Sequence, residues 1–315
     1  MKLALSTNWC NRRIADGAEI AEKALELGFD ALELGFRTPH SQVPGFKAML
    51  GKMPVGSIHA FCPVPVSAPA GHPELFQLAS FSQSESALAR AHLVNNIRFA
   101  AEIGAKTVVL HAGRVAFSSL FKIIDSTLLR TVLAKGENKT DARPYAQLLK
   151  KAKAIRAKNG AKMLDRFKSA LASVIPVLEE CHIQLGLENL PYLEGFPDET
   201  EMAALMTEFK DAPVRGWFDT GHHRVRVMLG WIDDFAPEAK NYFGMHLNDV
   251  VDYSDDHFAP GDGKVDFTAL ADFAAGIDHI VFEPNSDVTE EALKKGIEVI
   301  RAAFESPGGQ DAQVH

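Results

Sequence analysis

The sequence contains few cysteines and no long apolar run. Cys10, Cys62 and Cys181 lie far apart and form no CxxC pair, and the chain opens on the strand-like KLALST, so we expect a reduced, cytoplasmic protein. No apolar stretch approaches the roughly 20 residues that cross a bilayer, so no membrane span is expected. A Walker loop and a nucleotide-binding GxGxxG motif are also absent. The function must therefore be sought in other residues.

Charge of one sign is not dominant overall, but it is unevenly distributed. The composition, 46% hydrophobic and 23% charged, is typical of a globular protein with a sizeable core, and the net charge of -8 argues against a general nucleic-acid binder. Residues 115–170 nevertheless contain 13 Lys or Arg and only 4 Asp or Glu. This basic segment either attracts an anionic substrate or forms a solvated helical face.

Short apolar runs alternate with longer amphipathic segments along the chain. This pattern favours βα units around a parallel sheet, and eight units predict an α/β fold of the (β/α)8 TIM-barrel type. We expect a single barrel domain over 1–306 and a flexible tail over 307–315. The expected strands are 2–7, 31–36, 55–61, 106–111, 184–190, 214–219, 242–247 and 279–283.

The connection after the fourth expected strand is much longer than the others. Residues 115–160 are therefore predicted to form a basic helical insertion at the C-terminal face of the barrel, where active sites of this fold lie. A lid, a peripheral excursion and a dimer-forming segment are the alternatives. Gly28 and Gly104 follow helix-like stretches and are expected to end them by adopting positive φ.

Polar groups stand at or just beyond the ends of the apolar runs. Because parallel strands end on one face of a barrel, these imidazoles and carboxylates should meet there and could hold divalent metal. They are His59, His111, Glu188, Asp219, His222, His246, Asp255, His257 and Glu283. Four of them, Glu188, Asp219, His246 and Glu283, offer three oxygen donors and one imidazole, a set that suits manganese, magnesium, cobalt or zinc.

Five ordered motifs, GLENL, FDTGHH, HLND, DDHFAPGDGKVDF and VFEP, carry a resemblance to the xylose-isomerase-like TIM barrels. This superfamily includes sugar and sugar-phosphate isomerases and epimerases and the endonuclease IV type of zinc AP endonuclease. The resemblance implies that Glu188, Asp219, His246 and Glu283 form the shared metal site. In an isomerase or epimerase, Glu188 and Glu283 would move a proton next to a carbonyl through a metal-stabilised enediolate.

The alternative implied by the resemblance is a multinuclear zinc phosphodiesterase of the endonuclease IV type. All nine ligand positions match that family, which would allow up to three zinc ions: His59 and His111 with Glu188 would hold one, and His222, Asp255 and His257 another. Two departures disfavour this reading. The loop after His59 lacks the DNA-penetrating aromatic residue, and the arginine of the DRH triplet is Asp256 here.

The epimerase comparison also departs, because the arginine expected six residues after the metal histidine is Asp252. Candidate substrate contacts are Arg37, Arg114, Glu194 and Lys264; rim salt bridges and solvated loop positions are their structural alternatives. The expected partner is a small polyol or sugar phosphate, with nucleic acid only under the endonuclease reading. A homo-oligomer is compatible with the family, and a third reading is a barrel that keeps its metal but only binds a partner.

Overall fold

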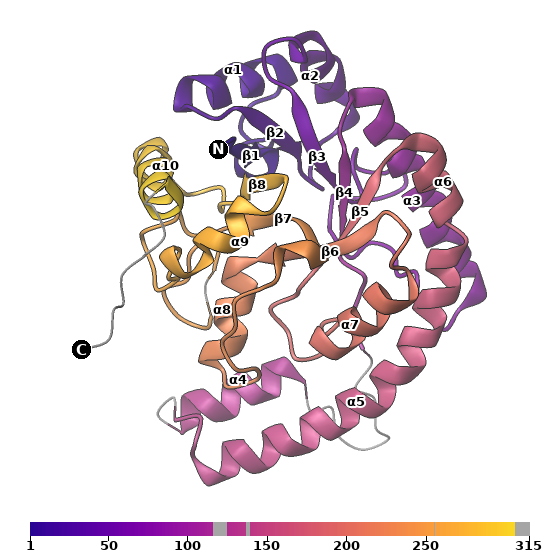
Figure 1. Cartoon of the computed structure of the whole chain (residues 1–315), viewed down its shortest axis with the longest axis vertical. Helices are drawn as coiled ribbons and strands as arrows, with labels where there is room; N and C mark the ends of the chain where they lie inside the picture. Colours follow the sequence, from indigo (N-terminus) through magenta and orange to yellow (C-terminus); the bar gives the residue numbers. More distant parts are fainter. Residues whose placement is uncertain (116–124, 137–138, 255, 306–315) are drawn as a thin grey trace.

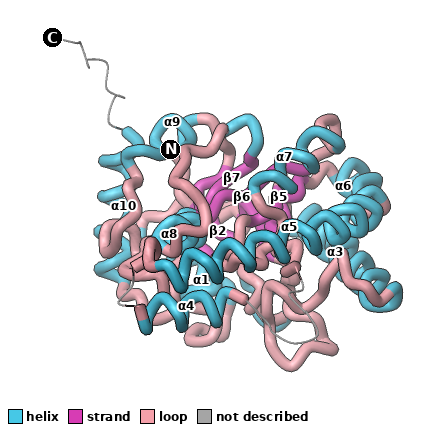
Figure 2. Tube along the Cα trace, turned by 90° about the horizontal axis from the view of Figure 1, so that it is seen from below, coloured by secondary structure: helices cyan, strands magenta, loops and turns pink. Residues whose placement is uncertain are grey.

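Eight parallel strands form a closed barrel in order of sequence in the computed structural model, which describes residues 1–115, 125–136, 139–254 and 256–305. Helices surround the strands on the outside (Figure 1, Figure 2). The predicted α/β barrel is therefore confirmed. The strands are β1 Ala4–Ser6, β2 Ala31–Leu34, β3 Val55–His59, β4 Thr107–Leu110, β5 Gln184–Glu188, β6 Val214–Asp219, β7 Tyr242–Leu247 and β8 His279–Phe282.

The strands form because their apolar runs are buried on both faces, between the barrel interior and the helical layer. In β4 all four residues are buried. The predictions for 214–219 and 242–247 match β6 and β7 residue for residue, whereas the other six extend beyond the ladder by one or more residues. These extra residues leave the ladder and enter the connecting loops.

The helices cover the barrel and bury apolar side chains against it. Gly28 (φ 97°) and Gly104 (φ 82°) end α1 and α3 in the left-handed conformation, as predicted. The helices are α1 Gly17–Leu27, α2 Val43–Met49, α3 Gln83–Ile103, α4 Ser126–Lys135, α5 Arg143–Ala172, α6 Ile175–Cys181, α7 Glu199–Glu208, α8 Thr220–Met228, α9 Ala271–Ala275 and α10 Glu290–Glu305, with short 3-10 turns at Thr7–Trp9, His40–Gln42, Ala239–Asn241 and Thr268–Leu270.

The expected insertion contains α4 and the first part of α5, which lie at the lower edge of the view in Figure 1. They pack on α8 through a separate apolar cluster that includes Leu129, Tyr145 and Trp231. The indole Nε1 of Trp231 donates to the Tyr145 hydroxyl at 2.9 Å, and that hydroxyl donates to the Leu229 carbonyl at 2.6 Å. The helical excursion is therefore docked on the barrel by its own small core.

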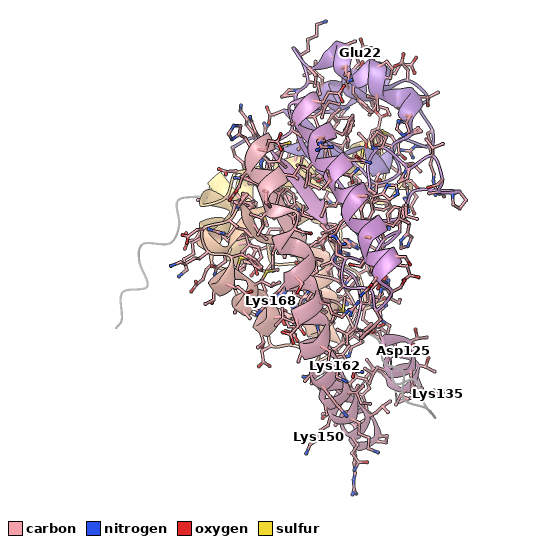
Figure 3. All side chains as sticks on the ribbon, turned by 90° about the vertical axis from the view of Figure 1, so that its right-hand side faces the viewer. Glu22, Asp125, Lys135, Lys150, Lys162 and Lys168 are labelled. Atoms are coloured by element: carbon pink, nitrogen blue, oxygen red, sulfur yellow. The ribbon has the colours of Figure 1, made fainter. Side chains whose placement is uncertain are left out.

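The expected boundary of the insertion at residue 160 has no counterpart in the secondary structure. Helix α5 runs without a break from Arg143 to Ala172, so its second half is also part of the layer around the barrel. Position 160 inside this helix requires glycine, because a β-carbon there would lie 2.2 Å from side-chain atoms of Arg156 and Glu201. Lys150, Lys162 and Lys168 lie along α5 on the outside of the molecule (Figure 3).

The barrel interior changes from apolar to polar along its axis. Ala4, Val109, Trp217 and Val281 form a buried apolar cluster inside the barrel. Closer to the C-terminal ends of the strands, the buried interior side chains are polar. Within the described residues, we find no helix that combines the length and apolar character of a membrane span.

Candidate metal centre

Four buried side chains bring their ligand atoms together where the second half of the barrel opens. Glu188 and Asp219 end β5 and β6, His246 lies in β7, and Glu283 directly follows β8. One ligand atom from each lies within 4.8 Å of the others. The Nδ1 atom of His246 is 3.0 Å from Glu188 Oε1, 3.1 Å from Glu283 Oε2 and 3.9 Å from Asp219 Oδ2. We call these four residues the core group.

Burial makes the core group a demanding electrostatic environment. Glu188, Asp219 and His246 are fully buried, and Glu283 is 5% exposed. Three carboxylates so close together repel one another unless cations or protons compensate them. A divalent cation is the kind of group that three oxygen donors and one imidazole accept, so the donor set fits a bound metal ion.

Two further groups of ligand type flank the core group. The Nε2 atoms of His59 and His111 each lie 3.0 Å from Glu188 Oε2, the oxygen that does not face His246. On the other side, His222 and His257 form a second cluster with Asp256. Asp255, the ligand that the sequence suggests here, lies outside the described residues. We call His59, His111, His222 and His257 the outer histidines.

Three of the outer histidines have their Nδ1 atoms on backbone carbonyls. His59 Nδ1 is 3.0 Å from Ala60 O, His222 Nδ1 is 2.8 Å from Asn189 O, and His257 Nδ1 is 2.7 Å from Glu283 O. A carbonyl only accepts, so each Nδ1 carries the proton. In the neutral ring, Nε2 then keeps its lone pair for a ligand, which is the usual arrangement of metal-binding histidines.

The acids of the core group titrate in different directions. Burial acts to raise the pKa of Glu188, but the neighbouring His246 and His111 outweigh it and hold that pKa well below the ordinary value. The pKa of Glu283 is also lowered, because His246 and His257 outweigh the effect of burial. Burial raises the pKa of Asp219. Glu188 and Glu283 are therefore the carboxylates of the group that stay ionised most readily.

The histidines respond to the same fields. Burial opposes a charge on His246, but Glu283, Glu33 and Glu188 together raise its pKa well above the ordinary value. For His257, burial is outweighed by Asp256, Glu283 and Asp219, and its pKa rises to about 9. Without a metal ion, the raised pKa values favour the doubly protonated, positively charged form of both rings at neutral pH.

Asparagines next to the ligands, which we did not single out from the sequence, fix Asp219 in place. Asn189 accepts from the Asp219 backbone N–H at 2.7 Å and donates to its carbonyl at 3.0 Å. Asn248 donates to Asp219 Oδ2 at 2.8 Å. Their positions in the sequence could have identified them: Asn189 directly follows the ligand Glu188 in GLEN, and Asn248 is two residues after the ligand His246 in HLN.

Asp249, the next residue of HLND, organises the loop that carries His257. Its buried carboxylate accepts the backbone N–H groups of Gly261, Gly263 and Val265 at 2.8–2.9 Å. It accepts the Val250 N–H as well, at 2.9 Å. The glycines of PGDGK therefore allow the backbone to approach this acid: a β-carbon on Gly263 would lie 2.4 Å from Asp249 Oδ1.

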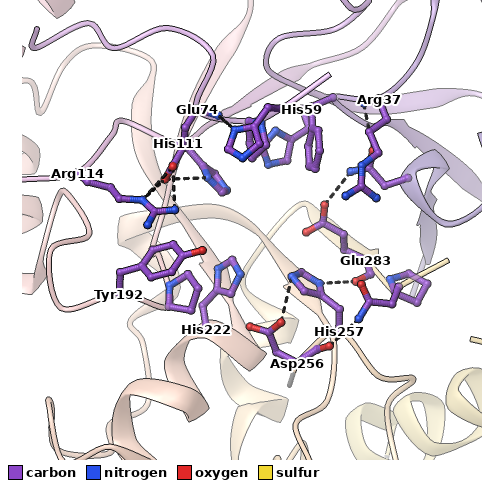
Figure 4. A pocket seen from close by; sticks show the side chains of 17 residues that line it. Arg37, His59, Glu74, His111, Arg114, Tyr192, His222, Asp256, His257 and Glu283 are labelled. Carbon is purple, nitrogen blue, oxygen red and sulfur yellow. Dashed lines mark hydrogen bonds and ion pairs between the residues drawn. The ribbon is translucent and has the colours of Figure 1, made fainter. Parts of the chain in front are cut away.

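A cavity of about 240 Å³ opens above the core group (Figure 4). Its lining includes Glu283, all four outer histidines and both candidate arginines, Arg37 and Arg114. Glu188 does not line it, because it lies beneath the outer histidines. The described part of the insertion contributes no lining residue.

The two arginines of the cavity differ in what they contact. Glu74 holds Arg114 with both carboxylate oxygens at 2.9 Å, and the guanidinium lies 3.5 Å from the centre of the Tyr192 ring. Arg37 forms no ion pair with a carboxylate in the described part of the chain. Its Nε atom is buried without a hydrogen-bond partner there, and burial followed by the neighbouring Arg12 lowers its pKa.

Glu194 and Lys264 lie apart from the cavity lining. The Glu194 carboxylate accepts the Ser126 hydroxyl at 2.5 Å and its backbone N–H at 3.2 Å, which ties the β5 loop to the start of α4. Lys264 is exposed, and its backbone N–H donates to the Val250 carbonyl. The structure thus brings Arg37 and Arg114 to the core group but not these two residues.

A closed eight-stranded parallel barrel with a buried carboxylate and histidine cluster at one end defines a (β/α)8 barrel of candidate metal-binding type. The chain belongs to the family described as Xylose isomerase-like TIM barrel, whose sequence profile matches residues 21–303. An uncharacterized protein of Methanocaldococcus jannaschii is 25% identical over 154 residues. These residues are 44% of this chain and 51% of that protein, so the chain matches about half the length of this relative.

Solved structures share the fold over nearly the whole chain. A D-tagatose 3-epimerase-like protein superposes with a TM-score of 0.62 at 19% identity, covering 97% of both chains. An L-ribulose 3-epimerase gives 0.65 at 14% identity, covering 97% of this chain and 95% of that one. The IolI protein with a bound zinc atom gives 0.62 at 12% identity, covering 97% and 98%. At these identities, the likeness establishes the fold.

Proposed function

We propose that this protein is a divalent-metal-dependent isomerase or epimerase of a sugar or sugar phosphate. The observation that carries the proposal is the convergence of the four buried ligand atoms of the core group within 4.8 Å. The fold neighbours named as 3-epimerases, and the zinc-containing one, support it by analogy.

The core group would hold the metal through Glu188, Asp219, His246 and Glu283. A divalent ion bound there would supply positive charge beside the substrate oxygens on which negative charge develops during proton abstraction. Manganese, magnesium, cobalt and zinc all suit this donor set. Metal-binding measurements in solution would identify the ion, and the neighbour with a bound zinc atom favours zinc.

Glu188 and Glu283 would move the proton at the carbon next to the carbonyl. The pKa values of both are lowered, so each is an ionised base at neutral pH. Glu283 lines the cavity and would reach a substrate directly, whereas Glu188 lies deeper, beneath the outer histidines. Asn8 Nδ2 donates to Glu283 Oε1 at 3.1 Å, while the second oxygen, Oε2, faces His246 Nδ1 at 3.1 Å.

The cavity selects a small, polar substrate. Its volume of about 240 Å³ lies below the usual range for drug-sized ligands, and its lining is rich in hydrogen-bonding side chains. Because Glu74 already neutralises Arg114, Arg37 is the cationic side chain of the lining best placed to take a phosphate or carboxylate. The described lysines of the insertion do not line the cavity, which favours the interpretation of that segment as a solvated helical face.

Exchange of solvent deuterium into a panel of ketoses and ketose phosphates tests this function. We expect metal-dependent incorporation at the carbon next to the carbonyl, lost in Glu283→Gln and retained in Glu298→Gln, a change of an exposed carboxylate on α10. Absence of exchange in the metal-loaded protein across the panel would contradict the proposal. In that case, metal without turnover would favour the binding-protein reading.

A multinuclear zinc phosphodiesterase is the second candidate, and the two flanking groups favour it. His59, His111 and Glu188 form one ligand set and His222, Asp256 and His257 another. The aromatic residue after His59 does not supply a DNA wedge, because Phe61 is fully buried and packs on Phe76. Cleavage of abasic-site DNA, abolished by His59→Ala, would establish this function in place of the first.

The partner and compartment follow from the same proposal. A small-molecule polyol or sugar phosphate is the proposed substrate, and nucleic acid enters only with the second candidate. The cytoplasm remains our proposed compartment because Cys10, Cys62 and Cys181 are all free thiols. A homo-oligomer stays a prediction, to be checked by sedimentation.

A further inference from the structure

Glu33 is a fully buried carboxylate to which the proposed chemistry gives no role. It lies in β2 and points into the barrel interior, on the side of His246 away from the core group. Its two oxygens lie 3.1 and 3.2 Å from His246 Nε2. One of them also accepts the Ser57 hydroxyl at 2.9 Å. The carboxylate is thus held by one residue from β3 and one from β7.

These contacts decide which nitrogen of His246 faces the core group. A neutral imidazole carries one proton, and two carboxylate oxygens at hydrogen-bond distance hold that proton on Nε2. The other nitrogen, Nδ1, faces Glu188 and Glu283 at 3.0 and 3.1 Å, and its lone pair would be free for a metal ion once that ion displaces the second proton of the ring. We propose that Glu33 is a positioning residue that fixes His246 as an Nδ1 metal ligand and strengthens its binding of the cation.

His246 needs a carboxylate for this task because of where it lies. Three of the outer histidines use backbone carbonyls from loops, but inside a closed barrel the strand carbonyls are committed to the ladder. The ring is also fixed by its neighbours: it stacks on His59 with centroids 5.8 Å apart and meets the edge of Trp217 at 5.2 Å. With its plane fixed in this way, the ring can be directed only by the group that faces Nε2.

A merely space-filling role does not explain this residue. The nearby barrel interior is packed with Trp217, Val109, Ala4 and Val281, so an apolar side chain would suit a filler. Burying a carboxylate is unfavourable unless it is paired and hydrogen-bonded. Glu33 also brings a fourth buried negative charge close to the proposed divalent ion, which favours cation binding at this end of the barrel.

The inference rests on the metal role proposed for His246, and metal affinity tests it without reference to turnover. We expect Glu33→Gln to weaken binding of Zn²⁺ and Co²⁺ by roughly 10- to 100-fold in chelator competition, the usual effect of mutating such a partner, because the negative charge that makes the ring a stronger donor is removed. The visible absorption of the Co²⁺ form should change as well. Glutamine matches the size of glutamate and can still accept the Nε2 proton, so the barrel should remain folded.

Thr107→Val is the matched control. Thr107 lies beside Ser57 in the β3–β4 ladder, is fully buried, and bonds to Gln184 instead of the cluster. It should leave metal affinity and the Co²⁺ spectrum unchanged. Equal affinities and spectra for wild type and Glu33→Gln would overturn the proposal and make Glu33 a structural residue.

Ser57→Ala covers the case in which Glu33→Gln does not fold. It removes one hydrogen bond to the carboxylate and should weaken metal binding by a few-fold, more than Thr107→Val does. An effect no larger than that of Thr107→Val would count against a positioning role. Failure of the wild-type protein to bind metal would refute the proposed function itself, a result distinct from either of these.

Discussion

At the scale of single residues, the hydrogen bond to one ring nitrogen of each of four histidines determines which nitrogen remains available as a ligand. His59, His222 and His257 place Nδ1 on carbonyls, whereas His246 is held through Nε2 by Glu33. The ligand positions could be predicted because strand ends share one face. Glu33 could not, because in ALELG either face of the strand suits it until the register of β2 against β3 is known.

Metal binding should release protons. The pKa of His257 is raised to about 9 and that of His246 well above its ordinary value, so both rings are protonated at pH 7 before metal binds. A ligating imidazole must be neutral, so we expect release of up to about two protons when zinc fills these positions. Titration calorimetry in buffers of different ionisation enthalpy measures the number.

Zinc affinity should increase with pH. A raised pKa means that protons compete with metal below that pKa, so apparent zinc affinity should rise with pH up to about 9 and then level off. His257→Asn should reduce the release by about one proton if His257 is a ligand. Heats that do not depend on the buffer would contradict these assignments.

The two arginines of the cavity should differ in their effect on an anionic substrate. Arg37→Gln should raise the KM for a phosphorylated or carboxylated sugar by about 10-fold or more and leave neutral sugars unaffected, because a charge-assisted contact is lost. Arg114→Gln is the comparison, since Glu74 already pairs with this side chain. Steady-state kinetics on matched neutral and anionic sugars measures these KM values. Equal KM changes for both sugar types in Arg37→Gln would exclude a role of Arg37 in binding the anion.

At the scale of elements, the loops beyond the strands are organised by acids and amides that are not ligands. Asp249 gathers four backbone N–H groups and so places the turn that follows His257. Glu194 joins the β5 loop to α4, which makes it a link to the insertion. Sequence spacing indicated tight turns here, but which acid holds them depends on contacts between residues 12 to 68 positions apart.

Asp249→Asn should destabilise the fold through this loop. The change replaces one accepting oxygen by an NH₂ donor that faces buried N–H groups. Hydrogen bonds to a charged acceptor contribute about 1.5–3 kcal/mol each. We expect the free energy of unfolding to fall by about 2–4 kcal/mol in urea denaturation. Asp262→Asn, in the same loop but exposed and bonded to Lys295, should cost under about 1 kcal/mol. Similar losses for both variants would contradict the organising role.

At the scale of the whole molecule, the barrel was predictable because eight apolar runs of similar length recur with amphipathic segments between them. The insertion was predictable from the length of one connection alone, but its boundary was not, because α5 continues from the insertion into the helical layer without a breaker. The gathering of the eight described candidate groups at one end follows from parallel strand direction. Their division into a core group and two flanking groups follows from side-chain geometry, which a single sequence does not contain.

Metal content per chain is the most direct test of the core group. The protein purified without chelator, dialysed against excess zinc or manganese and then against buffer, should retain at least about one ion per chain by plasma mass spectrometry. Glu283→Gln should lose it while Glu298→Gln keeps it. Retention of about three zinc ions would add the flanking groups as metal sites and favour the phosphodiesterase. A folded wild-type chain that retains no ion would contradict the metal centre.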